Sequence, residues 1–320
     1  GDEPEEPLSD DSLVIYSGRN ETLVGPLLDK LEAATGIDVQ VRYGGSSEMA
    51  AQLLEEGEGT KADLFFSQDA GALGALAKAG RLQALPEATT SKVQEGFADP
   101  AVLWVATSAR ARVIAYDPAQ APEVTSMTTV DAVLDPKYKG KVGFAPTNAS
   151  FQSFVTALRV SKGEAGAKAW LEAFKANEPK AYDNNILVLD AVDSGQVALG
   201  LVNHYYWYER VAEKGADAVN AKIHFLDAND PGALINVAGA GVLAGSQQSE
   251  AATKAVDFLL SDEAQQYFAD ETAEYPVVAG ITSTKHDLVP LADLKGLAID
   301  LNALNSLEET LAMLDEVGLT

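Results

Sequence analysis

The stretch "LVIYSGRNETLVGPLLDKLEAATGIDVQVRY", residues 13–43, decides the fold class. Its first five residues form a short apolar run of strand length, and the residues that follow carry apolar side chains at helical spacing up to Gly36. The last part, "IDVQVRY", alternates apolar and polar residues as a strand does. A strand, a helix and a second strand in succession predict a β-α-β unit.

The same alternation continues along the chain. "GGSSEMAAQLLEEGEG" predicts a helix, "ADLFFS" a buried strand and "DAGALGALAKAG" another helix. Such alternation predicts a parallel sheet covered on both faces, with the ligand crevice at the carboxyl ends of the strands. We therefore expect three strand-end loops to line one rim: "SGRNE" (17–21), "GGSSE" (44–48) and "SQDA" (67–70).

A second α/β set follows a change of pattern. "AVLWVATSARARVIAYDP" predicts two strands in quick succession, which suggests that the chain leaves the first sheet, and "LINVAGAGVLAG" predicts a strand that returns to it. The expected fold is thus α/β with two lobes, each a central sheet flanked by helices, and a ligand cleft between them. Lobe 1 is expected at residues 13–108 plus 236–285, and lobe 2 at residues 109–235 plus 286–320.

Composition excludes several classes of function. The chain has 320 residues, 47% of them hydrophobic, and a net charge of −25, which argues against nucleic acid or an anionic membrane surface as partner. It has no cysteine, so thiolate metal sites and cysteine nucleophiles are excluded. It lacks G-x-G-x-x-G after the first strand, a P-loop, G-x-S-x-G and H-E-x-x-H, so we expect neither a nucleotide-binding protein nor an enzyme.

The first twelve residues, "GDEPEEPLSDDS", are acidic and contain proline, so residues 1–12 are expected to be disordered. We interpret them as a tether between a removed targeting segment and the fold. This interpretation suits an extracytoplasmic protein, either periplasmic or a cell-surface lipoprotein. A plain acidic tail is the alternative.

An aromatic cluster, "NHYYWY", follows the predicted strand "QVALGLVN" and begins a helix. Adjacent side chains diverge by about 100° within a regular helix, but at its first turn two phenol oxygens can converge on one small object. A strongly charged hard cation can lower the phenol pKa of ~10 enough to ionise it. Tyr205 and Tyr206 therefore suit ferric ion. Packing or a partner surface is the alternative role of such a cluster, in particular for Trp207 and Tyr208.

The chain resembles the bacterial periplasmic ferric-ion-binding proteins, the solute-binding components of iron(III) ABC importers. The similarity covers nearly the whole chain from Leu13, and "NHYYW" is its most specific block. It implies the type II periplasmic-binding-protein fold and a monomer that delivers ferric ion, or a small ferric chelate, to the permease of an ABC transporter. The blocks that carry it, in order, are "IYSGRNE", "ATGIDVQVRYGGSSE", "ADLFFSQD", "SARARVIAYD", "FAPTNASFQSFV", "NHYYW", "DPGALINVAGAGVL" and "AEYPV".

The resemblance also implies a site. It assigns Tyr205 and Tyr206 as iron ligands. It implies a synergistic anion, either phosphate, carbonate or citrate, which backbone N–H groups ahead of the following helix would help to hold. Arg110 and Arg112 are expected to anchor that anion or orient the phenolates, with a structural role as the alternative, and His204 is expected behind the ligands. The residues implied for anion binding are Asn148, Ala149, Ser150, Asn185 and Asn203.

The chain departs from the family pattern on the opposite wall. Asn20, followed by Glu21, stands where many members have a histidine ligand. Gln68, followed by Asp69, stands where they have a glutamate ligand. We expect Glu21, Gln68 and Asp69 to contribute to the metal site with Asn20 behind them, while helix capping is the alternative role for these residues and for Ser150.

A second function remains open for the same fold. Because the usual histidine and glutamate are replaced, the cleft is also suited to a small organic molecule or an anion such as a phosphonate, without iron. The aromatic side chains would then stack on the bound molecule.

Overall fold

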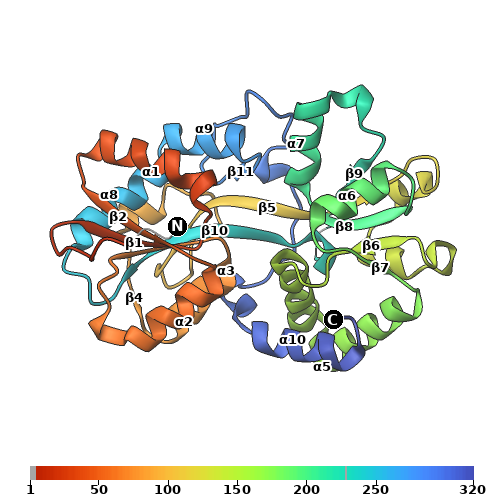
Figure 1. Cartoon of the computed structure of the whole chain (residues 1–320), viewed down its shortest axis with the longest axis horizontal. Helices are drawn as coiled ribbons and strands as arrows, with labels where there is room; N and C mark the ends of the chain where they lie inside the picture. The colour runs from red at the N-terminus through yellow and green to blue at the C-terminus, as the bar shows by residue number, and fades with distance from the viewer. Residues whose placement is uncertain (1–4, 228) are drawn as a thin grey trace. The chain divides into compact units, whose positions relative to one another are not determined.

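The computed structural model describes residues 5–227 and 229–320. The chain divides into two compact units, which are described separately. Unit 1 comprises the residues up to Ala109 together with Val237–Thr282, and unit 2 comprises Arg110–Asn236 together with Ser283–Thr320. Each unit is a sheet flanked by helices, which confirms the predicted α/β fold class (Figure 1).

The sheet of unit 1 is built on the opening β-α-β unit. Strand β1 (Leu13–Ser17) lies between β2 (Val39–Tyr43) and β3 (Leu64–Ser67), and both pairs are parallel. The returning strand β10 (Ile235–Leu243) pairs antiparallel with β3 and with β4 (Leu82–Gln83). The short β11 (Tyr275–Pro276) pairs antiparallel with the first part of β5 (Val105–Tyr116). The carboxyl ends of β1, β2 and β3 thus lie at one edge, where the predicted loops begin.

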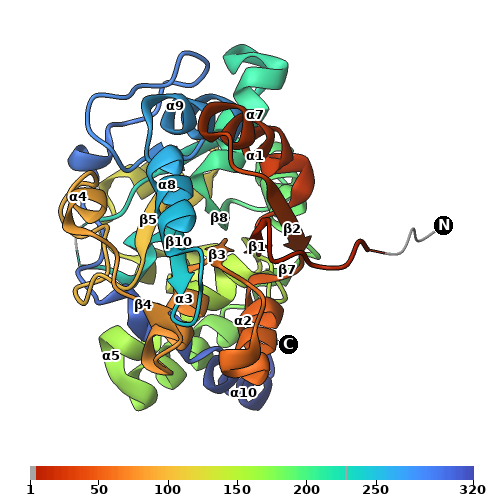
Figure 2. The ribbon, with the colours of Figure 1, turned by 90° about the vertical axis from the view of Figure 1, so that its left-hand side faces the viewer.

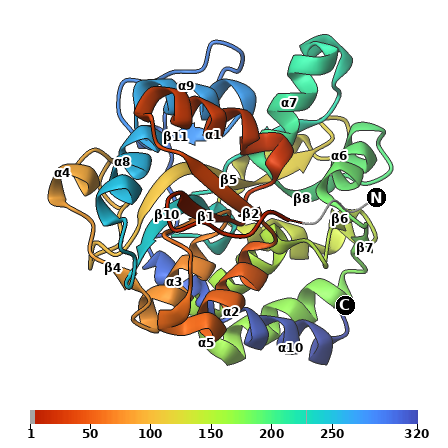
Figure 3. The ribbon, with the colours of Figure 1, turned by 60° about the vertical axis from the view of Figure 1, so that its left-hand side comes forward.

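Helices cover both faces of this sheet. α1 (Glu21–Thr35), α8 (Ser249–Leu259) and α9 (Asp262–Glu271) lie on one face, and α2 (Ser46–Glu56) and α3 (Ala70–Lys78) lie on the other (Figures 2 and 3). The short α4 (Glu87–Thr90) contacts α8. All five residues of β1 are buried, as expected for a strand covered on both sides.

The sheet of unit 2 contains the second part of β5. β8 (Leu199–Asn203) and β9 (Lys222–His224) pair antiparallel with β5, β6 (Val142–Phe144) pairs parallel with β8, and β7 (Lys180–Ala181) pairs parallel with β6. The prediction of two strands around Arg110 is wrong, because β5 is one strand of twelve buried residues that passes from unit 1 into unit 2.

Two apolar cores lie on the two faces of this second sheet. The larger core contains the rings of Phe144, Phe154 and Trp170, under α5 (Ala149–Ala176) and α10 (Leu307–Val317). The smaller core lies under α6 (Asn185–Asp193) and α7 (His204–Lys214), on the opposite face (Figure 1). α5 is kinked at Gly163, whose φ of 75° breaks the helix into two parts.

The acidic start of the chain is only partly described. Residues 1–4 of the expected disordered tether lie outside the described residues. In the described part, the Ser9 N–H donates to Oε1 of Gln40 at 2.7 Å, and Glu5 forms an ion pair with Arg42 at 3.0 Å. Both contacts join the described part of this segment to the edge strand β2, and the expected disorder of residues 1–12 stays a prediction.

Candidate functional site

The two adjacent tyrosines lie at the first turn of α7, directly after β8. The phenol oxygen of Tyr205 lies 3.2 Å from that of Tyr206, and the ring centroids are 4.4 Å apart with an interplanar angle of 38°. Inside a longer stretch of helix these neighbours would point about 100° apart. At this helix start the two oxygens converge, so they can act together on one small ligand.

His204 is a buried side chain that packs against the tyrosines of α7. Its side chain is fully buried, and its Nδ1 accepts a hydrogen bond from the backbone N–H of Ala111 at 3.1 Å. Its ring contacts Tyr205 and Tyr208 edge-on, with centroids 5.7 Å and 5.9 Å away. The histidine therefore fixes the start of α7 to β5 and braces the Tyr205 ring, while Trp207 Nε1 donates to the carbonyl of Ala221 at 2.8 Å.

Two arginines of β5 are buried in unit 2, Arg110 at 6% and Arg112 at 4% exposure. They lie two residues apart on one strand, so both side chains extend from the same face. Nη1 of Arg112 donates to Oγ of Ser150 at 3.1 Å and to Oδ1 of Asn203 at 3.2 Å. Burial lowers the pKa of Arg112 to about 10, and the neighbouring phenols of Tyr205 and Tyr206 act in the opposite direction. Arg112 therefore remains a cation at neutral pH.

Burial also affects the pKa of the Tyr205 phenol. The pKa of Tyr205 is raised above its usual range, first by burial and then by the adjacent Tyr206, while the charge of Arg110 acts to lower it. Tyr205 is therefore a neutral phenol at pH 7. A nearby cation of high charge would have to supply the electrostatic energy that ionises it.

The residues expected to bind an anion meet around one hydroxyl group. Oγ of Ser150 accepts hydrogen bonds from Arg112 and, at 3.0 Å, from Nδ2 of Asn185, and it donates to Oδ1 of Asn148 at 2.5 Å. Asn148 also caps α5 by accepting the Ser150 N–H at 2.8 Å. Ser150 thus links β5 to the start of α6 and to the start of α5, where Ala149 is the first helical residue.

Several buried polar atoms in this cluster have no hydrogen-bond partner among the described residues. They include three donors, namely Nη1 of Arg110, Nη2 of Arg112 and Nδ2 of Asn203. A buried donor without an acceptor costs about 1–3 kcal/mol, so clustered donors of this kind in a folded protein indicate a place for a bound acceptor. The cluster suits an oxyanion, since two of the three donors belong to guanidinium groups.

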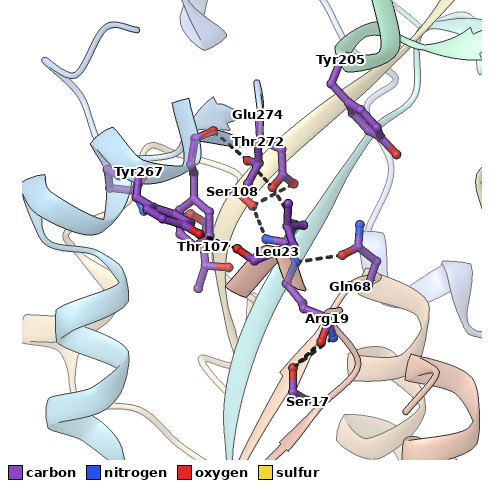
Figure 4. Close-up of polar contacts among 12 residues, drawn as sticks. Ser17, Arg19, Leu23, Gln68, Thr107, Ser108, Tyr205, Tyr267, Thr272 and Glu274 are labelled. Atoms are coloured by element: carbon purple, nitrogen blue, oxygen red, sulfur yellow. Dashed lines mark hydrogen bonds and ion pairs between the residues drawn. The ribbon is translucent and has the colours of Figure 1, made fainter. Parts of the chain in front are cut away.

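Unit 1 has a buried ionic network that sequence reasoning missed. Nη2 of Arg19 lies 2.6 Å from Oε1 of Glu274, and the two side chains are only 1% and 3% exposed. Oγ of Ser108 accepts from Arg19 at 3.2 Å and donates to Glu274 at 3.0 Å (Figure 4). The guanidinium carbon also lies over the rings of Phe66 and Phe268, 5.8 Å and 5.5 Å from their centroids. No local sequence signal pairs residues that are 255 positions apart.

The predicted site residues of unit 1 have local roles. Oδ1 of Asn20 caps α1 by accepting the Thr22 N–H at 2.8 Å, and the Asp69 carboxylate caps α3 by accepting the N–H groups of Gly71 and Ala72. Oε1 of Gln68 accepts a hydrogen bond from Nε of Arg19 at 2.8 Å, and its backbone N–H donates to Oγ of Ser46 at 2.9 Å. Glu21 is exposed in the first turn of α1.

The structure therefore gathers the predicted site residues into one cluster in each unit. The cluster in unit 2 contains the tyrosine pair and the anion-binding residues, and the cluster in unit 1 contains the loops after β1 and β3. Within the described ranges, no group of three or more His, Asp or Glu side chains is placed to hold a metal ion. No helix in the same ranges has the length and apolar character needed to cross a membrane.

Comparison with known proteins identifies relatives of similar length. The family described as bacterial extracellular solute-binding protein matches residues 59–297. The major ferric iron-binding protein of Neisseria meningitidis serogroup A is 34% identical over 310 residues, which cover 96% of this chain and 93% of that protein. The Fe(3+)-binding periplasmic protein of Serratia marcescens is 33% identical over 97% of this chain and 91% of its own length.

Solved structures agree with the sequence matches. Iron-bound HitA from Pseudomonas aeruginosa is 34% identical, has a TM-score of 0.84, and the alignment covers 96% of this chain and 99% of that one. The Trichodesmium protein IdiA (FutA), solved with iron and citrate, is 28% identical with a TM-score of 0.83 over 97% of this chain and 100% of the other. The chain therefore belongs to the bacterial extracellular solute-binding proteins and, within them, to the periplasmic ferric-ion-binding proteins.

Proposed function

We propose that this chain is an extracytoplasmic solute-binding protein that binds ferric iron through Tyr205 and Tyr206 and delivers it to the permease of an ABC importer. The observation that carries the proposal is the 3.2 Å separation of the two phenol oxygens at the start of α7. Two converging phenolates offer hard, anionic oxygen donors, which a small trivalent cation prefers. The names of the relatives support iron as the solute.

The proposal extends to the anion. Asn148, Ala149, Ser150, Asn185 and Asn203 would hold phosphate, carbonate or citrate beside the metal, with Arg112 as the buried cation that anchors it. The supporting evidence is the hydrogen-bonded cluster around Ser150 and the unpartnered donors of Arg112 and Asn203. The anion would supply oxygen donors that two tyrosines cannot, since iron(III) prefers about six.

The buried arginines give the site its electrostatic balance. A bound anion, together with the phenolates that form when the metal binds, concentrates negative charge in a partly buried place, and Arg110 and Arg112 help to offset that charge. Binding of a trivalent cation would release the phenol proton of Tyr205. Raised proton concentration would therefore favour release of the metal.

The residues of unit 1 that were predicted to bind the metal differ in whether they already form other hydrogen bonds. Glu21 has an exposed carboxylate at the start of α1 and is proposed as an oxygen donor. The assignment of Gln68 and Asp69 to the metal, with Asn20 behind them, stays a prediction. Their hydrogen bonds give all three another role, because Asn20 and Asp69 cap helices and Gln68 binds Arg19.

The same proposal covers the cellular context. Solute-binding proteins of this family act outside the cytoplasm without catalysing a reaction, so we propose a monomeric transport component, either periplasmic or anchored as a lipoprotein. Its partner would be the membrane permease of the importer. Size-exclusion chromatography with light scattering tests the monomer, and reconstituted ferric uptake with and without the protein tests the transport role.

A spectroscopic titration tests the proposed iron site. Purified protein stripped with a chelator and titrated with ferric citrate should develop a visible tyrosinate-to-iron band that saturates at one equivalent. Tyr205→Phe and Tyr206→Phe should each weaken or abolish it. Tyr208→Phe, which changes a packing residue of the same helix, is the matched control and should keep the band. A wild-type protein that stays colourless would refute the proposal.

A further inference from the structure

A hydrogen bond from Arg19 determines the orientation of the Gln68 side-chain amide. Nε of Arg19 donates to the Gln68 amide at 2.8 Å, and arginine carries only donors, so the amide atom that faces it must be the oxygen. The donor chemistry of arginine therefore fixes the orientation of the Gln68 amide. Figure 4 shows the amide nitrogen of Gln68 on the side away from Arg19.

The side chain of Arg19 is itself held in one orientation by several contacts. Its guanidinium is buried, forms an ion pair with Glu274, donates a hydrogen bond to Ser108 and contacts two aromatic rings. Thr272 fixes the far side of the network by donating to Oε1 of Glu274 at 2.7 Å. The arginine is therefore a rigid base for the Gln68 amide, and the ion pair with Glu274 compensates its charge.

The backbone of Gln68 is fixed as well. Its N–H donates to Oγ of Ser46, the first residue of α2, at 2.9 Å. Gly18 makes this approach possible, because a Cβ at that position would lie 1.9 Å from the same oxygen. The side chain of Gln68 is half-buried at the carboxyl end of β3, which is where loops of an α/β sheet meet their ligand.

We infer, on the basis of the proposed function, that Gln68 presents an N–H donor to the solute in place of a metal ligand, and that unit 1 therefore recognises a carboxylate-bearing ferric chelate. Arg19 is the positioning residue. The amide nitrogen of Gln68 has no hydrogen-bond partner among the described residues, whereas its oxygen is bonded to Arg19. The remaining lone pair of that oxygen lies beside a guanidinium group, which is an unfavourable place for a trivalent cation.

The neighbouring residues agree with this assignment. The carboxylate of Asp69 accepts two backbone N–H groups of α3, and Oδ1 of Asn20 accepts one of α1, so both side chains already serve as helix caps. The hydrogen bond from Arg19 also polarises the Gln68 amide, which strengthens its N–H groups as donors. A chelator carboxylate is the acceptor that gains most from such a donor.

Two ways of supplying iron test the inference. Apparent affinity is measured by the visible band with ferric citrate, a carboxylate chelate, and with ferric ion supplied from a weak chelator in the presence of bicarbonate. For Gln68→Glu we expect affinity for ferric citrate to fall about tenfold or more, because a donor becomes a like charge. Affinity in bicarbonate should stay equal or rise, since a carboxylate ligand is gained. Gln68→Met should lose affinity for ferric citrate but not for ferric ion supplied in bicarbonate.

Controls separate the role of the donor from charge and from folding. Gln247→Glu makes the same charge change on an exposed part of unit 1 and should leave both affinities unchanged. Arg19→Lys keeps a cation for Glu274 but removes the Nε donor, so it should reduce the preference for citrate. Gln68 is half-buried, so its variants test the idea even if Arg19→Lys fails to fold.

The outcomes distinguish the two proposals. Equal loss in both arms, or an unchanged affinity of Gln68→Glu for ferric citrate, would overturn the donor role of Gln68 while leaving the tyrosine site intact. No band for the wild-type protein in either arm would overturn the iron site itself, and with it this inference.

Discussion

Nη2 of Arg19 lies 2.6 Å from Oε1 of Glu274, in an ion pair whose two side chains are only 1% and 3% exposed. The pair joins the loop after β1 to the segment between α9 and β11, two parts of unit 1 that are far apart in sequence. Truncating one partner of such a pair leaves an uncompensated buried charge, which costs about 3–5 kcal/mol.

The first prediction follows from this pair. Glu274→Ala should lower the free energy of unfolding of unit 1 by about 3–5 kcal/mol, measured by denaturant titration. The matched control is Glu316→Ala, which removes a carboxylate whose partner Lys168 is exposed, and its denaturation midpoint should not change measurably. Similar small effects for both variants would show that the buried pair does not hold the loop after β1.

Gly18 provides a second prediction about stability. A Cβ at this position would lie 1.9 Å from Oγ and 2.7 Å from Cα of Ser46, so Gly18→Ala should force the loop after β1 away from α2 and cost about 1–3 kcal/mol. Gly59→Ala is the control, since nothing lies within 4 Å of the added Cβ. Thermal unfolding of the two variants checks this. An unchanged melting temperature for Gly18→Ala would contradict the close approach.

A third prediction concerns the buried cation of unit 2. Arg112→Gln removes the charge that bonds Ser150 and Asn203, so the dependence of ferric binding on added phosphate or bicarbonate should weaken about tenfold. Arg210→Gln makes the same charge change on α7 and should retain the full anion dependence. The measurement is ferric affinity at a series of anion concentrations. Equal anion dependence in wild-type protein and Arg112→Gln would show that Arg112 does not help to bind the anion.

The fourth prediction concerns pH. Because the pKa of Tyr205 is raised by burial, its phenol is protonated throughout the physiological range, and ferric binding must displace that proton. Affinity should therefore rise with pH, by about tenfold per pH unit for each phenol that ionises, and fall as the pH is lowered. Tyr205→Phe should reduce the slope by about one proton. Affinity measured from pH 6 to 8 checks this, and a slope that Tyr205→Phe leaves unchanged would rule out ionisation of this phenol.

The sequence predicted those parts of the fold that depend on local pattern. Strand β1, helix α1 and strand β2 were expected at the positions observed, because the apolar spacing, the cap at Asn20 and the left-handed Gly36 all act within a few residues. The returning strand β10 was also expected. The single strand β5 was not, because two strands were expected within "AVLWVATSARARVIAYDP", whereas Val105–Tyr116 forms one strand of twelve buried residues.

The site was predictable to a different degree. The aromatic cluster and the family pattern pointed to Tyr205 and Tyr206, whose phenol oxygens the structure brings together. The roles of Asn20 and Asp69 as helix caps were foreseen as an alternative, because capping is a local interaction. The orientation of Gln68 depends on Arg19 and on Glu274, which is distant in sequence, so no local pattern could have revealed it.

The most direct test of the iron site is resonance Raman spectroscopy of the stripped protein after addition of one equivalent of ferric citrate. With excitation in the visible band, the wild-type protein should show enhanced tyrosinate ring vibrations. These should weaken in Tyr205→Phe and in Tyr206→Phe and vanish in the double variant, with folding verified by circular dichroism. Ring vibrations of full intensity in the double variant, or their absence from iron-loaded wild-type protein, would contradict binding of iron by this tyrosine pair.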